Sequence, residues 1–168
     1  MGSRGAYVKG RIFSDEEIEA MREAMEWKRK CSMTTSEARE KVNELLRDKV
    51  IETPIYDEEH STGLIKFNSN GRNDILSDAH SITSEQKWIV QKFQQDYHKL
   101  NVDYTGWEEL RKDSHNYSKK VAKKFTGFNK YEFDYMGKRW RIKTAVIGDN
   151  WFEQPYFVGE IKRQPLLS

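Results

Sequence analysis

The sequence predicts an α+β fold in which a helical N-terminal part of about four helices precedes a three- or four-stranded antiparallel β-meander. Two observations predict this fold. Capping boxes followed by apolar residues at helical spacing recur through the first part of the chain, and aromatic residues alternate with charged ones near its end. We expect one domain over residues 14–168, with helices and the sheet over residues 83–168, preceded by a flexible arm over residues 1–13.

Two N-terminal helices are predicted from their capping residues. Ser14 with Glu17 forms a capping box, in which two side chains satisfy free N–H groups of the first turn. Thr34 with Glu37 starts the second helix in the same way after a short turn. We expect these helices, over residues 14–50, to form an acidic antiparallel hairpin. Their expected buried stripes are Ile18, Met21, Ala24 and Met25, and Ala38, Val42, Leu45 and Leu46.

The segment over residues 51–82 is less regular than the helices before it. We expect a short strand at residues 63–67 and a loop over residues 68–74, because asparagine, glycine and serine dominate that stretch. Thr83 with Gln86 then starts a third helix. Its expected buried stripe is Ile89, Phe93, Tyr97 and Leu100.

A fourth helix is expected over residues 106–125. At 100° per residue its apolar side chains share one arc, formed by Trp107, Leu110, Tyr117, Val121 and Phe125. The opposite side is basic, with Lys112, Lys119 and Lys123, flanked by Lys120. Lysines spaced along a helix can follow a phosphate backbone, and an ordinary solvated helix face has the same pattern.

The C-terminal meander has a register that can be predicted. Aromatic residues alternate with acidic ones before Gly137, and apolar residues alternate with basic ones after it. A two-residue turn at Gly137 and Lys138 sets Asp134 opposite Arg141 on the polar face. A third strand is expected over residues 156–163.

The composition excludes several classes of protein. The 168 residues include a single cysteine, Cys31, which excludes an intrachain disulfide framework and a cysteine-rich zinc site. No apolar run is long enough to span a bilayer, and the first residues contain no stretch of signal-peptide type. We therefore expect a cytoplasmic protein that uses no cofactor, binds no metal ion and does not enter a membrane.

Charge is unevenly distributed, although 29 basic residues nearly balance 27 acidic ones. Residues 14–60 hold 14 acidic and 8 basic residues, whereas residues 111–143 hold 11 basic and 3 acidic ones. The basic block favours contact with a nucleic acid or an acidic partner, and the acidic block is also suited to mimic a nucleic acid on a basic host protein. The structural alternative is that the acidic and basic blocks face each other within the fold.

The first six residues, MGSRGA, resemble the M-G-x-R-G-A start of many small proteins encoded by phages and prophages of Gram-positive bacteria. That resemblance implies a mobile-element setting in a bacterial host cell. We therefore expect a non-enzymatic accessory protein that binds a nucleic acid or a nucleic-acid-binding host protein, as an inhibitor of a host defence system. The expected phosphate contacts are Lys112, Lys119, Lys120, Lys123 and Arg139.

The alternative is a metal-free ribonuclease toxin. The order of helices first and antiparallel sheet last is similar in outline to ribonucleases of the barnase, colicin and RelE type, which cut RNA with side chains projecting from the sheet. This resemblance is architectural and includes no specific motif. The candidate catalytic residues are His80, Arg141, Lys143, Tyr156 and Glu160.

A metal-dependent nuclease is not expected. Asp149 and the Glu160-Ile161-Lys162 segment resemble the D…ExK signature of PD-(D/E)xK nucleases, in which two carboxylates hold Mg²⁺. In the predicted meander, however, Asp149 lies in a turn about four residues from Glu160 along the strand. At about 3.3 Å per residue this separates the two carboxylates by over ~10 Å, too far to share one ion.

Overall fold

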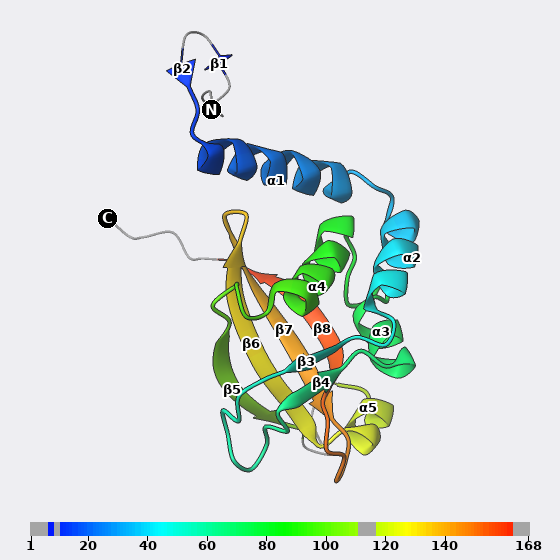
Figure 1. The fold of residues 1–168 in the computed structure, drawn as a ribbon. Coiled ribbons are helices and arrows are strands. Elements are labelled where there is room, and N and C mark those ends of the chain that lie inside the picture. The colour runs from blue at the N-terminus through cyan, green and yellow to red at the C-terminus, as the bar shows by residue number, and fades with distance from the viewer. Residues whose placement is uncertain (1–6, 9–10, 111–116, 163–168) are drawn as a thin grey trace, which may run out of the picture.

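A computed structural model describes residues 7–8, 11–110 and 117–162 of the chain. It confirms the α+β class: helices occupy the N-terminal half and a four-stranded antiparallel sheet follows (Figure 1). The helices are α1 (Asp15–Cys31), α2 (Thr35–Leu46), α3 (Ser69–Ile75), α4 (Ser84–Asp96) and α5 (Lys119–Lys124). The large sheet has the order β5 (Asp103–Glu109), β6 (Gly127–Tyr135), β7 (Lys138–Val146) and β8 (Gln154–Ile161).

Two smaller antiparallel pairs complete the strands that the structure describes. The first joins β1 (Tyr7–Val8) to β2 (Arg11–Ile12), within the segment expected to be a flexible arm; the rest of that arm before residue 11 lies outside the described residues. The second joins β3 (Val50–Glu52) to β4 (Leu64–Lys66), which confirms the strand expected near residues 63–67.

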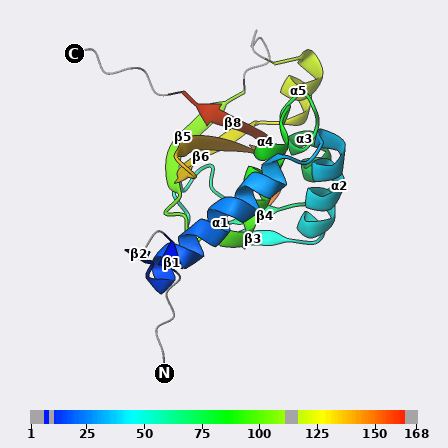
Figure 2. The ribbon, with the colours of Figure 1, turned by 90° about the horizontal axis from the view of Figure 1, so that it is seen from above.

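Helices α1 and α2 begin at their predicted caps, but the expected antiparallel hairpin is wrong. Both helices pack on α4, α1 across it and α2 along its flank (Figures 1 and 2). Ala38, Val42 and Leu46 of α2 are buried as predicted. On α1 the buried residue is Trp27, whereas Met25 is 72% exposed. Because α1 meets the body through its Trp27 side, the stripe expected to be buried faces outward.

Helix α3 replaces the loop expected over residues 68–74. Asn68 caps it, since its side-chain oxygen accepts a hydrogen bond from the Gly71 N–H at 2.8 Å. The composition that is typical of loops is also typical of helix caps. Helix α4 begins at the predicted capping box, and Ile89, Phe93 and Tyr97 lie in the core.

The expected fourth helix is also wrong. Most of its first part is strand β5, whose Tyr104 pairs with Tyr131 of β6, and its last part is the short helix α5, capped by Ser118. Gly106 interrupts the β5 register with a φ of 120°, a conformation that favours glycine. The register shift breaks the strict alternation that identifies a strand in the sequence, and the apolar residues of this segment therefore matched the spacing of a helix.

The β6–β7 hairpin is confirmed, with a register two residues away from the expected one. Met136 and Gly137 both have positive φ values, 49° and 75°, and form the two-residue turn. Asp134 therefore pairs with Arg139 instead of Arg141, which pairs with Glu132. A shift of two residues preserves the faces of the strands, so the predicted inward and outward sides are correct.

The two faces of the large sheet carry separate apolar clusters. The inner face, covered by α4, packs Phe133, Trp140 and Ile142 against Trp88 and Phe93. The outer face has a smaller cluster near α5, formed by Leu110, Phe125, Phe128, Ala145 and Tyr156. No helix among the described residues is both long and apolar enough to cross a membrane.

A buried carboxylate joins the small sheet to the large one. Glu153 is 0% exposed, and its backbone bridges to β4 beside Ile65. Its Oε1 accepts hydrogen bonds from Tyr131 at 2.8 Å and Thr144 at 2.6 Å. The backbone N–H of Thr62 donates to Oε2 at 3.1 Å, and the Thr62 hydroxyl lies 3.0 Å from the same oxygen. Every partner is an uncharged donor. The buried carboxylate thus links the segment before β4 to strands β6 and β7 through hydrogen bonds.

Candidate functional site

A pocket of about 460 Å³ lies at the α5 end of the outer sheet face. Strands β5, β7 and β8 contribute to its walls, together with α5 and the turn that precedes α4. The lining side chains include a histidine, a carboxylate, a lysine and two tyrosines, which are residue types that perform acid–base chemistry. They are His80, Glu108, Tyr117, Ser118, Val121, Lys143, Tyr156 and Phe157.

A register shift between β7 and β8 shapes the strand side of the pocket. Lys143 pairs with Phe157, whereas the next residue, Thr144, pairs with Pro155. Tyr156 is therefore the extra residue of a bulge, and both it and Phe157 pack on the outer-face cluster. Without this shift, regular alternation would turn one of the two rings toward the inner face.

Glu108, Tyr117 and Lys143 form a closed hydrogen-bonded triangle in the pocket. Tyr117 donates to Glu108 Oε2 at 2.5 Å, and the Lys143 ammonium donates to Glu108 Oε1 and to the Tyr117 hydroxyl, each at 3.1 Å. Burial opposes ionisation of Glu108, but these two donors outweigh it and lower the pKa of the carboxyl. Burial and the Glu108 charge raise the pKa of Tyr117. At neutral pH the triangle holds a carboxylate, an ammonium and a neutral phenol.

His80 is held in one tautomer. Its Nδ1 lies 2.8 Å from the backbone carbonyl oxygen of Asp74, which can only accept, so Nδ1 carries the proton. In the neutral ring, Nε2 therefore has a free lone pair. The ring lies 4.5 Å from that of Tyr156, centroid to centroid. Burial, with a smaller contribution from the Asp74 charge, raises the pKa of Tyr156, which keeps its hydroxyl protonated.

Three of the five expected ribonuclease residues therefore line one pocket: His80, Lys143 and Tyr156. The other two do not join them. Arg141 donates to Glu132 at 2.8 Å on the outer face, and Glu160 lies near Lys138 beside α4, on the inner side of β8. A regular alternation along β8 explains this separation, since Glu160 stands two residues from the inward-facing Val158.

Sequence reasoning missed Glu108 and Tyr117. Both fell within the segment expected to form one helix, where they would have had no strand partners. Reading residues 103–109 as a strand would have placed Glu108 beside β6 on the outer sheet edge, from where its side chain reaches across β6 to Lys143 of β7.

The expected phosphate-binding residues have different surroundings. Lys119 and Lys120 are exposed on α5 and form no ion pair with any residue that the structure describes. Lys112 lies outside the described residues, and the side chain of Lys123 does as well. Arg139 is engaged by three carboxylates, those of Asp103, Glu132 and Asp134, at 2.8, 3.3 and 3.3 Å. Its guanidinium thus already has acidic partners within the sheet, and the expected phosphate contact stays a prediction.

The pocket and its surroundings offer no ready metal site. Over residues 7–8, 11–110 and 117–162, no three or more histidine, cysteine or acidic side chains are grouped so as to hold an ion. Asp149 is exposed in the turn after β7, while Glu160 lies on β8 with Lys162 at 3.3 Å.

Similarity to known proteins does not assign this site. Comparison of the chain with protein-family models, with curated proteins and with solved structures gives no match.

Proposed function

We propose that this protein binds a nucleic acid along α5, with a phosphate group at the mouth of the adjoining pocket. One observation carries the proposal: Lys119 and Lys120 stand exposed and unpaired, among the described residues, on the helix whose residues Ser118 and Val121 line the pocket. Unpaired lysines release counterions when they meet phosphates, whereas a paired arginine such as Arg139 must first lose its carboxylate partners.

The pocket supplies features that a phosphate chain can use. The Lys143 side chain is 16% exposed and borders the pocket, and Phe157 contributes a partly exposed aromatic ring beside it, whereas Tyr156 is only 7% exposed. Bases of single strands stack on such rings without strong sequence preference. A single-stranded nucleic acid therefore fits this surface better than a duplex, whose bases are already stacked.

The binding test compares a double variant with a control of equal charge. Lys119→Ala/Lys120→Ala should weaken binding of a fluorescent single-stranded RNA by about tenfold or more at low salt, and should reduce the salt slope by about 0.7 per lost phosphate contact. Lys41→Ala/Lys99→Ala removes the same charge from exposed positions on α2 and after α4 and should bind like the wild type.

Two results would overturn the proposal. One is that the wild type binds neither RNA nor DNA even at low salt; the other is that the two double variants bind alike. The first result would favour the other partner class expected from the sequence, a nucleic-acid-binding protein that meets the acidic α1–α2 region.

The pocket also supports a second candidate function, the cleavage of bound RNA without a metal ion. His80 Nε2 would accept the 2′-hydroxyl proton as that oxygen attacks phosphorus, and Lys143 would stabilise the charge that develops on the phosphoryl oxygens. Tyr156 would protonate the departing 5′-oxygen. The products are a 2′,3′-cyclic phosphate and a 5′-hydroxyl end. After the reaction His80 would be an imidazolium and Tyr156 a tyrosinate. Transfer of a proton from His80 to Tyr156, whose ring centroids lie 4.5 Å apart, would restore the starting state.

The cleavage test uses RNA in EDTA with protein in excess. The wild type should release cyclic-phosphate ends, and His80→Ala should slow that release by about a hundredfold while RNA affinity changes little. His98→Ala, in an exposed histidine after α4, is the matched control. RNA that stays intact while bound to the wild type would eliminate catalysis and leave the binding proposal in place.

A further inference from the structure

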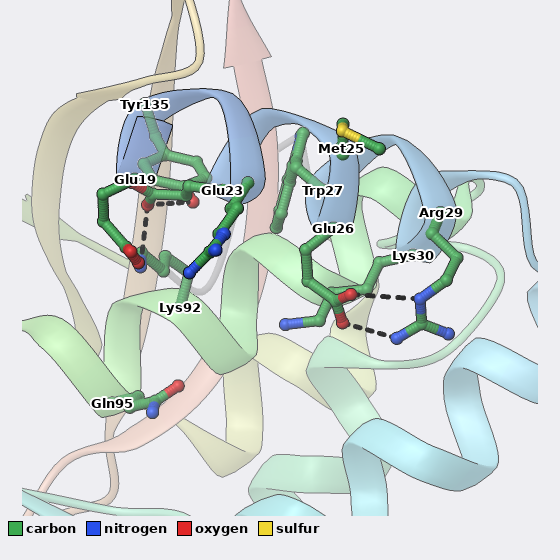
Figure 3. A pocket seen from close by; sticks show the side chains of 11 residues that line it. Glu19, Glu23, Met25, Glu26, Trp27, Arg29, Lys30, Lys92, Gln95 and Tyr135 are labelled. Atoms are coloured by element: carbon green, nitrogen blue, oxygen red, sulfur yellow. Dashed lines mark hydrogen bonds and ion pairs between the residues drawn. The ribbon is translucent and has the colours of Figure 1, made fainter. Parts of the chain in front are cut away.

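Helix α1 is attached to the rest of the protein along one side only. Trp27 packs edge-on against Tyr135, with ring centroids 4.9 Å apart, and Glu23 accepts hydrogen bonds from Tyr135 and Lys92. Figure 3 shows Trp27 and Glu23 of α1 directed toward α4 and β6, while Met25 projects from the side of α1 turned away from α4. Trp27 is the one residue of this 17-residue helix that is buried.

The outward side of α1 is apolar. Met21 is 41% exposed and Met25 is 72% exposed, and Ile18 falls on the same arc at helical spacing. Ile12, on the strand just before the helix, is exposed as well. A helix of this length is marginal in water on its own, and methionine-rich stripes of this kind suit partner surfaces.

Charge along α1 is divided into two halves of opposite sign. Residues 15–23 hold five acidic residues and one arginine, whereas residues 24–31 hold three basic residues and one glutamate. On the outward side, Asp15 and Glu17 flank the apolar stripe near its start, and Lys28 and Arg29 flank it near its end, where the Arg29 guanidinium also pairs with Glu26 of the same helix. This pattern is complementary to itself when a second identical helix runs in the opposite direction.

We propose that the outward side of α1 binds a second copy of this chain as an antiparallel helix pair. A two-fold axis on the outward side, midway along the helix between Met21 and Met25, sets Met21 of each helix beside Met25 of its partner, and each acidic half then lies along the basic half of the other copy. A parallel pair would bring like charges together. Because one helix pair buries less area than a standard protein interface, we expect a weak, micromolar dimer that high salt dissociates.

The test uses charge-reversed variants that can rescue each other. Asp15→Lys/Glu17→Lys makes the outward side basic throughout, and Lys28→Glu/Arg29→Glu makes it acidic throughout. In sedimentation velocity at about 100 µM protein and low salt, each variant alone should be monomeric and an equimolar mixture should dimerise. The wild type should dimerise in low salt and dissociate at about 0.5 M salt.

Circular dichroism of each variant separates a lost interface from a lost helix, because the mixture can recover the dimer only if both helices are formed. Met21→Ala/Met25→Ala should also weaken the dimer without changing the helix signal. A wild type that stays monomeric at this concentration overturns the proposal. Charge-reversed variants that dimerise alone as well as the wild type overturn it too, since the contact would then lie elsewhere.

Discussion

Two carboxylates at opposite faces of the sheet have different surroundings. Glu153, under the inner face, is fully buried and is bonded only to neutral donors from Thr62, Tyr131 and Thr144. Glu108, on the outer face, is 30% exposed and is bonded to a lysine and a tyrosine in a pocket. Both accept a tyrosine hydroxyl, so the residue types alone do not distinguish the two sites.

The difference teaches how a carboxylate is used in each region. Glu153 is itself fully buried among the strands and the loop that carry its partners, so we assign it a role in the fold. The partners of Glu108 border open volume, and the carboxylate holds the Lys143 ammonium beside that volume. Loss of the inner carboxylate should therefore destabilise the fold strongly, and loss of the outer carboxylate should alter the pocket with a smaller effect on stability.

The largest expected effect is on stability at the inner site. Glu153→Ala leaves buried hydrogen-bond donors of Tyr131, Thr144 and Thr62 without an acceptor, so the free energy of unfolding should fall by about 3 kcal/mol or more. Urea unfolding measures this change. Glu109→Ala, at an exposed neighbour of the pocket carboxylate, should change it by less than about 0.5 kcal/mol. Equal effects of the two variants would contradict the structural role of Glu153.

A functional effect is expected next, at the outer site. Lys143→Met keeps the aliphatic stem but removes the ammonium, so the affinity for single-stranded RNA should fall several-fold and any cleavage should fall by about a hundredfold. The free energy of unfolding should change by about 1 kcal/mol or less, because the group is partly exposed. A loss of stability as large as that of Glu153→Ala would show that the pocket is part of the structural core instead.

The acid dependence of stability should be affected by two carboxylates of the outer face, Glu108 and Glu132. Burial works against ionisation of Glu108 and Glu132, but hydrogen bonds from lysine, tyrosine and arginine outweigh it, and the pKa of each carboxyl is lowered from its ordinary value of 4.5. A lowered pKa stabilises the fold above that value, and the contribution is lost as pH falls through the lowered one. Glu108→Gln/Glu132→Gln should therefore lose less stability between pH 4.5 and more acidic conditions than the wild type. Thermal melts across this window measure it, and parallel curves would contradict the assignment.

The smallest effect is expected at Arg139. Its ion pairs with Asp103, Glu132 and Asp134 lie at the sheet surface, where such pairs contribute about 0 to 1 kcal/mol each. Arg139→Ala should therefore lower the melting temperature slightly and leave RNA affinity within about twofold. The RNA affinity of Arg139→Ala is measured in the same assay as that of Lys119→Ala/Lys120→Ala, which should lose much more. A larger loss of affinity in Arg139→Ala would show that phosphate displaces the carboxylates after all.

Local signals predicted most of the fold. Side-chain capping at Ser14, Thr34 and Thr83 acts within one helical turn, so the starts of α1, α2 and α4 were readable from the sequence. The faces of the β6–β7 hairpin were readable because alternation has a period of two. Its register was not, because a turn at Met136 requires a positive φ from a residue that seldom adopts it.

The site was less predictable because it depends on contacts that are distant in sequence. His80, Lys143 and Tyr156 were expected as candidates from their residue types, but their meeting depends on the β8 bulge, which has no sequence signal. Strand β5 was mistaken for helix because a glycine interrupts it, and Glu108 was lost with it. The pattern of an amphipathic helix also does not show whether its apolar side is buried or exposed to water. The exposed apolar stripe of α1 is an example.

The separation of the apolar residues into an inner and an outer cluster has a consequence for motion. The strands β6 to β8 run through both clusters, but α5 and Tyr117 are attached to the smaller outer one. Fluctuations that detach this end need not disturb the aromatic packing beneath α4. Backbone amides around the pocket should therefore exchange with deuterium through local openings of lower free energy than those that expose the amides of β7 beside Trp140. The protein can thus open locally around the pocket while its central strands stay closed.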